Sequence, residues 1–175
     1  MEDNDADIAA IRRFAQGERE ALGEIASRHE RAMLSLAKGL LGSASLAEEA
    51  VQDAWVRAIR GSATFEGRAA VRTWLYRIVI NRCRDLAKRE RRRSMPLPFA
   101  KPAPPPVQEN GDRHALVRRV IASLPIDQRE AVVLCVALGT THTAAAELLD
   151  TPVGTVKSRV RLGLDRLRQS VGGDT

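Results

Sequence analysis

The chain has 175 residues, of which 44% are hydrophobic but only 3% aromatic, so aliphatic side chains and alanine must build most of any core. Its formal net charge is +6, which favours an acidic partner such as nucleic acid. Because the sequence has no apolar run of about 18 residues and begins with an acidic segment rather than a signal peptide, we expect a cytoplasmic protein without membrane insertion.

The N-terminal part is predicted to be all helix. A short amphipathic helix covers residues 5–14, and apolar residues then recur at steps of three and four over residues 18–41, the period of a helix with one buried face. Ser45, followed by an acidic pair, is expected to open a third helix that ends at Gly61. After a turn-rich stretch, a long helix is predicted from about residue 69 to 92.

Charge divides this part of the chain into two blocks. Residues 1–53 carry 6 basic and 11 acidic side chains, whereas residues 54–95 carry 12 basic and 3 acidic ones. A basic block next to an acidic one predicts a nucleic-acid surface beside a surface for another partner. A membrane surface is the alternative partner for the basic block, but no lipidation motif supports it.

A proline-rich segment marks a domain boundary. Six of the eight prolines lie between Pro96 and Pro106, and proline removes backbone donors and restricts φ, so neither a helix nor a paired strand is expected there. We therefore predict an extended linker over residues 93–112, which separates a domain of residues 1–92 from a domain of residues 113–175.

The C-terminal part is also predicted to be helical. Helices are expected over residues 113–123 and 125–137, the latter with Val132, Val133 and Val136 available for burial. A short helix, Thr141–Leu149, is followed by a three-residue break and a basic helix that carries Pro152 in its first turn and Thr151 as a candidate cap.

Two helices joined by so short a turn, the second one basic, are typical of a DNA-binding helix-turn-helix. Taken alone, the last helix is equally well explained as a solvent-facing amphipathic helix. The predicted fold class is all-α, with two small helical domains joined by a proline-rich linker and a helix-turn-helix in the C-terminal domain.

Two groups of motifs carry a family resemblance. The first group is Glu48-Glu49-Ala-Val-Gln52-Asp53-Ala-Trp55, then Phe65-Glu-Gly67, then Arg72-Thr-Trp-Leu-Tyr-Arg-Ile78 with Asn81 and Asp85. The second is Leu124-Pro125 with Gln128-Arg129-Glu130, then Gly139, then Pro152-Val-Gly-Thr-Val-Lys-Ser-Arg159. In this order they resemble regions 2 and 4 of bacterial sigma factors of the sigma-70 family, most closely the extracytoplasmic-function group. Residues 140–144 depart from the family's usual pattern, and Asp150 stands where glycine is common.

The resemblance implies roles for particular residues of the first domain. The acidic helix would dock on a coiled coil of the largest polymerase subunit, through Glu48, Gln52, Asp53 and Trp55. Trp55 is equally well explained as a core residue. The minus-ten promoter element would be melted and recognised by Thr64, Phe65, Arg68, Asn81, Arg84 and Lys88. Phe65 would help to capture an unstacked base, but it also fits a position at the edge of the core.

The resemblance also implies that the last helix enters the major groove at the minus-35 element. The candidate contacts are Thr155, Lys157, Ser158, Arg159 and Arg161. Arginine bonds guanine with two donors and serine bonds several base edges, so we expect Lys157, Ser158 and Arg161 to approach bases. Arg159 is expected to contact phosphate or solvent.

The implied partners are core RNA polymerase, promoter DNA and an anti-sigma protein that clamps between the two domains, in a stress or envelope response. The sequence has no glycine-rich phosphate loop, nucleophile elbow or metal-ligand spacing, so we expect no catalytic residue, metal, cofactor or enzymatic activity. The alternative function is a stand-alone helix-turn-helix regulator with an N-terminal sensing domain. Such a regulator binds duplex DNA by itself, whereas a sigma factor of this type requires polymerase.

Overall fold

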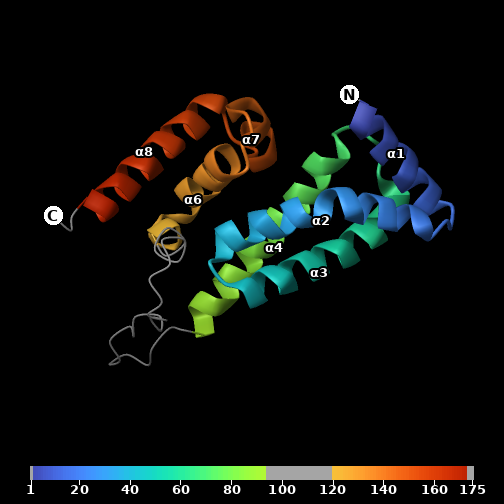
Figure 1. Cartoon of the computed structure of the whole chain (residues 1–175), viewed down its shortest axis with the longest axis horizontal. Coiled ribbons are helices and arrows are strands. Elements are labelled where there is room, and N and C mark those ends of the chain that lie inside the picture. Colours follow the sequence, from blue (N-terminus) through green and yellow to red (C-terminus); the bar gives the residue numbers. More distant parts are fainter. Residues whose placement is uncertain (1, 94–119, 173–175) are drawn as a thin grey trace.

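The computed structural model describes the backbone of residues 2–93 and 120–172, and every regular element in these two ranges is helical (Figure 1). The N-terminal bundle consists of α1 (Glu2–Ala15), α2 (Glu20–Leu41), α3 (Ala44–Gly61), the short 3-10 helix η1 (Ser62–Thr64) and α4 (Val71–Arg93). The C-terminal bundle contains α6 (Ile126–Val132), the π-helical turn η2 (Val133–Ala137), α7 (His142–Leu149) and α8 (Val153–Gly172). The all-α fold with two small domains is confirmed. The predicted linker, apart from Arg93, and most of the helix expected over residues 113–123 lie outside the described residues.

The core of the N-terminal bundle follows the predicted helical period. α2 buries one side chain at every third or fourth position, namely Ile25, His29, Met33, Leu36 and Leu40. α3 presents alanines to its neighbours, and Ala47, Ala50, Ala54 and Ala58 are all buried. Because alanine has a small side chain, α3 can approach both α2 and α4 closely and still fill the space between them.

The junction between α2 and α3 is defined by local chemistry. α2 ends at Gly42, whose φ of 68° is a left-handed conformation that glycine adopts without strain. α3 is capped by Ser43, whose hydroxyl accepts a hydrogen bond from the backbone N–H of Leu46. The prediction that Ser45 opens this helix is therefore wrong by two residues, because Ser43 has the extended backbone conformation that a cap requires.

A buried carboxylate holds α1 against α2. Asp7 is only 3% exposed, and its two oxygens contact Nε2 of His29, at 2.6 Å, and the guanidinium of Arg28. The side-chain oxygen of Asn4 accepts a hydrogen bond from the backbone N–H of Val71, at the start of α4. These contacts satisfy polar groups that would otherwise be costly to bury.

The helix-turn-helix is formed by α7 and α8. Thr141 caps α7 by accepting a hydrogen bond from the N–H of Ala144, and Asp150 adopts a left-handed conformation with φ of 51°. Aspartate tolerates this conformation better than most residues, which explains how it replaces the family's usual glycine.

Two details of the C-terminal prediction are wrong. Thr151 does not cap α8, because its hydroxyl donates to the carbonyl of Leu149, and the carbonyl of Pro152 accepts the first backbone hydrogen bonds of the helix instead. Val136 is 55% exposed, whereas Val132 and Val133 are buried. The π-helical turn interrupts the 3.6-residue step on which the expected burial of Val136 rested.

The two bundles contact each other. α6 and η2 pack against α2, and α7 packs against α4 (Figure 1). One face of α4 and the C-terminal part of α2 therefore lie against the C-terminal bundle.

Candidate nucleic-acid and polymerase interfaces

The residues predicted to bind polymerase differ in their exposure along α3. Glu48 and Gln52 are exposed and lie one turn apart, which leaves both side chains open to a partner.

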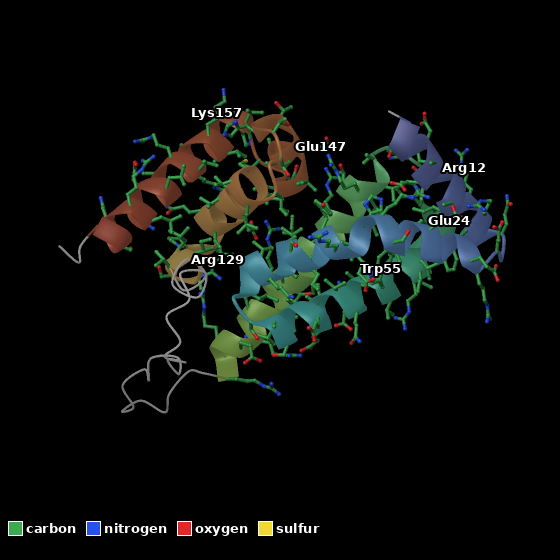
Figure 2. All side chains as sticks on the ribbon, viewed as in Figure 1. Arg12, Glu24, Trp55, Arg129, Glu147 and Lys157 are labelled. Carbon is green, nitrogen blue, oxygen red and sulfur yellow. The ribbon has the colours of Figure 1, made fainter. Side chains whose placement is uncertain are left out.

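Trp55 is half-buried and packs against the core (Figure 2). Together with Trp74 it lines an apolar cavity of about 10 Å³, which is at the lower limit for one water molecule. Of the two explanations for Trp55, the structure supports a contribution to the core.

Arginines of α4 reach the acidic face of α3. Asp53 forms an ion pair with Nη2 of Arg82 at 2.6 Å. Glu49, which was not among the predicted site residues, accepts hydrogen bonds from Arg89 at 2.9 and 3.1 Å. The hydrogen bond from Arg89 is the main cause that lowers the pKa of Glu49 below its ordinary value. Part of this acidic face is thus engaged within the fold. As a consequence, an arginine placed at position 53 would meet Arg82.

The turn between α3 and α4 places its aromatic residue against the bundle. The ring of Phe65 is half-buried, with its centroid 4.8 Å from that of Trp74 and a tilt of 43° between the planes, a favourable arrangement for an aromatic pair. Thr64 and Arg68 are exposed on the same turn. Arg68 forms an ion pair with Glu66. The side chain of Phe65 therefore belongs to the edge of the core, and the exposed polar residues flank it.

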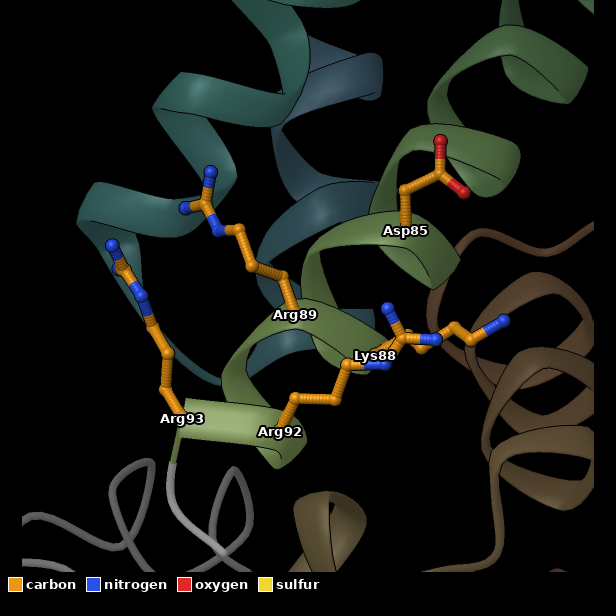
Figure 3. Close-up of a pocket in the computed structure, with 5 residues that line it drawn as sticks. All are labelled: Asp85, Lys88, Arg89, Arg92 and Arg93. Carbon is orange, nitrogen blue, oxygen red and sulfur yellow. The ribbon is translucent and has the colours of Figure 1, made fainter.

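The basic residues of α4 form a continuous surface. Asn81, Arg84 and Lys88 are exposed at steps of three and four, so they share one face of the helix. Near the end of α4, an open hollow of about 400 Å³ is lined by Asp85, Lys88, Arg89, Arg92 and Arg93 (Figure 3). Arg89 extends toward α3, where it binds Glu49, whereas Lys88 extends to the other side of the helix (Figure 3). The excess of cations suits a phosphate backbone.

α8 has a buried apolar side and an exposed basic side. Val156 and Val160 are buried, while Lys157, Ser158 and Arg161 are exposed. Figure 2 shows Lys157 pointing outward from the helix. These three residues are therefore available to base edges.

The other two predicted contacts of α8 are less available. Arg159 is half-buried and donates from Nη2 to Asp127 of α6 at 3.0 Å. Thr155 is half-buried, and its backbone carbonyl accepts a hydrogen bond from the hydroxyl of Ser158. Arg159 thus braces α8 against α6, and its expected contact with phosphate stays a prediction.

The sequence analysis assigned no role to four residues that join the two bundles. They are Arg77 and Arg129, which donate to backbone carbonyls of the opposite bundle, and Glu130 and Glu147, which pair with arginines of α4. Glu130 is 1% exposed. Glu130 stands directly before the apolar run of residues 131–138, and this position was the available signal, since a carboxylate buried beside such a run requires a charged partner.

Neither a membrane-spanning helix nor a metal site is found in the part of the chain that the structure describes. Within residues 2–93 and 120–172, no helix has the length and apolar character needed to span a bilayer. Among the same residues, no group of three or more His, Cys, Asp or Glu side chains is arranged to hold a metal ion.

Comparison with known proteins identifies the family. The family models for Sigma-70 region 2 and for Sigma-70, region 4 match residues 25–93 and 114–167, respectively. The ECF RNA polymerase sigma factor SigM of Mycobacterium tuberculosis is 34% identical over 179 aligned positions, which cover 98% of this chain and 86% of that protein.

Two solved structures resemble this one. A structure of CnrH in complex with the cytosolic domain of CnrY has a TM-score of 0.73 at 24% identity, covers 97% of this chain and 99% of that chain, and supports the fold alone. A co-crystal structure of the sigma factor RpoE with the anti-sigma factor NepR, from Bartonella quintana, has a TM-score of 0.70 at 26% identity and covers 88% of this chain and 98% of that one. With both of its helical domains matched in order, this chain belongs to the sigma-70 family of RNA polymerase sigma factors, in the extracytoplasmic-function (ECF) group.

Proposed function

We propose that this sigma factor binds core RNA polymerase and directs it to a set of promoters in a stress or envelope response. It acts in the cytoplasm as a transcription initiation factor and not as an enzyme. Residues 1–92 bind the core enzyme and recognise and melt the minus-ten element. Residues 113–175 recognise the minus-35 element, and residues 93–112 link the two domains.

The outer face of α8 is the observation that carries this proposal. Lys157, Ser158 and Arg161 are exposed on the helix that follows a three-residue turn, while Val156 and Val160 anchor the opposite side. This is the arrangement of a recognition helix, which buries one side in its own domain and presents the other to the major groove. The exposed Glu48 and Gln52 on α3 support a second, separate surface for polymerase.

Regulation by an anti-sigma protein is part of the proposal. The RpoE structure that resembles this one contains an anti-sigma factor. We infer that a comparable inhibitor binds this chain and competes with core polymerase.

Transcription with purified components tests the function. Core RNA polymerase with the full chain should initiate at discrete promoters in a genomic DNA library, and transcript starts that match those of core enzyme alone would contradict the proposal. The double variant Lys157→Ala/Arg161→Ala should lose this selection. The matched control is Arg166→Ala/Arg168→Ala, which removes two exposed charges from the far part of the same helix and should keep it.

The size of the effect separates base reading from phosphate contact. If Lys157 or Arg161 reads a base, its loss should cost about 1–3 kcal/mol and relax the preference at one promoter position. If both contact only phosphate, binding should weaken equally on all sequences. The slope of the logarithm of the binding constant against the logarithm of the salt concentration should then fall by about one unit for each residue removed.

A stand-alone regulator would use the same helix-turn-helix of α7 and α8. It predicts tight binding of the free chain to duplex promoter DNA. A gel-shift titration with the promoters found above, with and without core enzyme, distinguishes the two functions, since a sigma factor of this group should shift duplex DNA only with polymerase.

A further inference from the structure

The first helix, α1, lies outside the part of the chain that matches the family model for Sigma-70 region 2, which begins at residue 25. It is nevertheless fixed on the N-terminal bundle. Ala10 and Ile11 are 0% and 3% exposed, and the buried carboxylate of Asp7 contacts the side chains of Arg28 and His29 on α2. Apolar and polar contacts together therefore hold α1 in one position.

The start of α4 has no capping side chain of its own. The carbonyl of Ala70 accepts the first backbone hydrogen bond of the helix, from the N–H of Trp74 at 3.0 Å, so Ala70 occupies the N-cap position, and alanine has no side-chain acceptor. Asn4 of α1 supplies one, because its Oδ1 accepts a hydrogen bond from the backbone N–H of Val71 at 3.0 Å. An N–H in the first turn of a helix has no partner within that helix. Asn4 thus caps α4 from a helix 67 positions away in sequence.

α1 also borders the turn between α3 and α4, residues 62–70. The first half of this turn is held by a local hydrogen bond, which the hydroxyl of Thr64 donates to the carbonyl of Gly61 at 3.1 Å. In the second half, Gly67 has a φ of 72°, a left-handed conformation that favours glycine. A Cβ atom at this position would be 3.9 Å from Cδ1 of Ile8 on α1. Figure 1 shows α1 beside this turn, and α1 contacts both η1 and α4.

This turn and α4 carry every residue that we propose for the minus-ten element. The ring of Phe65 lies against that of Trp74, in the first turn of α4. A frayed helix start would therefore disturb the aromatic pair and the exposed residues beside it. The proposed contacts on the turn and on α4 are Thr64, Phe65, Arg68, Asn81, Arg84 and Lys88.

We propose that Asn4 is a positioning residue for the minus-ten element. By capping α4 from α1, it fixes the turn of residues 62–70 and thereby sharpens the choice of base without touching DNA. The inference rests on the proposed function, because the geometry of the turn affects base choice only if the turn captures a promoter base. A turn that is ordered in advance loses less conformational entropy when a base binds to it. Loss of the cap should therefore weaken capture of the melted strand and leave the helix-turn-helix unaffected.

The test uses three single variants of the full chain. Asn4→Ala removes the acceptor. Asn4→Asp keeps an acceptor on a side chain of the same length and should rescue the cap, because aspartate and asparagine cap helices about equally well and a negative charge suits a helix N-terminus. Asp5→Ala is the matched control, because it changes the adjacent, exposed residue of the same helix.

Hydrogen exchange of the backbone N–H of Val71, followed by nuclear magnetic resonance, reports the cap itself. Removal of a capping side chain shifts the equilibrium between the ordered and the frayed helix start by roughly fivefold. Exchange at Val71 should therefore rise about fivefold in Asn4→Ala and stay at the wild-type rate in Asn4→Asp and Asp5→Ala. Unchanged exchange in Asn4→Ala would show that Asn4 does not cap α4 and would overturn the inference.

Binding of each variant, in complex with core polymerase, to promoter DNA with a premelted minus-ten element reports base recognition. Asn4→Ala should bind the native premelted promoter about fivefold more weakly and should discriminate less against a copy with one substituted minus-ten base. Its affinity for core enzyme and its discrimination against a substituted minus-35 element should match the wild type, and Asn4→Asp should restore the minus-ten values. A loss shared equally by core binding and minus-35 recognition, or one that Asn4→Asp does not restore, would indicate general destabilisation and overturn the positioning role.

Transcription by the wild type with core enzyme separates this inference from the proposed function. If the wild type initiates at discrete promoters while Asn4→Ala keeps full minus-ten discrimination, the positioning role is wrong and the function stands. If the wild type gives only the transcript starts of core enzyme alone, the proposed function fails, and the positioning role fails with it whatever the exchange rate at Val71.

Discussion

Alanine at Gly163 should destabilise the helix-turn-helix, although alanine is the better helix former. Gly163 lies on α8 where that helix crosses α6, and a Cβ atom there would be 2.6 Å from Cγ2 of Val132. Val132 is 2% exposed and β-branched, so relief requires the two helices to move apart. Overpacking of this kind costs about 1–3 kcal/mol, whereas the gain in helix propensity is about 1 kcal/mol. Because the contact is so short we take the upper end, which gives a net loss of about 2 kcal/mol.

Two optical signals assign this loss to one bundle. Trp55 and Trp74, the two tryptophans of the chain, both belong to the N-terminal bundle, whereas far-ultraviolet circular dichroism follows the helices of both bundles. For a domain of this size, a loss of 1 kcal/mol lowers Tm by about 4–8 °C. Part of the circular dichroism signal of Gly163→Ala should therefore be lost at a temperature roughly 8–16 °C below that of the wild type, while the midpoint of the tryptophan fluorescence transition stays unchanged.

The control is Gly154→Ala, on the same helix, because nothing lies within 4 Å of the position of its Cβ. It should melt at or slightly above the wild-type temperature. If Gly163→Ala is as stable as Gly154→Ala, the close approach of α8 to α6 at Val132 is refuted, and with it the placement of the recognition helix on its domain.

Three other predictions follow from single side chains. Gln52→Arg should weaken binding to core polymerase in a pull-down. Because the side chain is exposed, it should change the free energy of unfolding by less than about 0.5 kcal/mol. A large loss of stability would show that Gln52 supports the fold instead. The hydrogen bond from Arg89 lowers the pKa of Glu49 below 4.5, so the ionised Glu49 stabilises the fold above pH 4.5, and this stabilisation is lost as the pH falls through the folded pKa. The difference in Tm between wild type and Glu49→Gln should therefore disappear in acid. A difference that stays constant with pH would contradict this. Burial raises the pKa of Cys83 to about 12, so a thiol reagent at neutral pH should modify the half-buried Cys135 first, and equal rates in the folded protein would show that Cys83 is accessible.

Most of the helices were predictable because their signals are local. Apolar residues at steps of three and four located α2, and Gly61 with the turn-rich stretch after it separated α3 from α4. The error at the start of α3 occurred because two residues competed for one local role. Ser43 and Ser45 are both plausible caps by residue type, and only the extended backbone at Ser43 decides between them.

The candidate site was predictable to a lesser degree. The exposed face of α8 was expected from the resemblance, which placed Lys157, Ser158 and Arg161 at the major groove, and the buried Val156 and Val160 anchor the opposite side of the helix. The sequence did not distinguish Trp55 as a core residue from Trp55 as an interface residue, since both roles use an aromatic side chain on the same helix. Its burial depends on residues of α1, α2 and α4, which line the same small cavity only in the folded bundle.

By itself, then, the sequence determined the all-α class, the helix-turn-helix and the family resemblance, because each rests on residue types at short, regular spacings. The tertiary structure alone decided which charges pair. Asp53 with Arg82, and Glu130 with Arg84, are joined across 29 and 46 positions of sequence. A charged side chain has many candidate partners of opposite sign in an unfolded chain, and it acquires a specific one only when packing of the apolar faces brings two helices together.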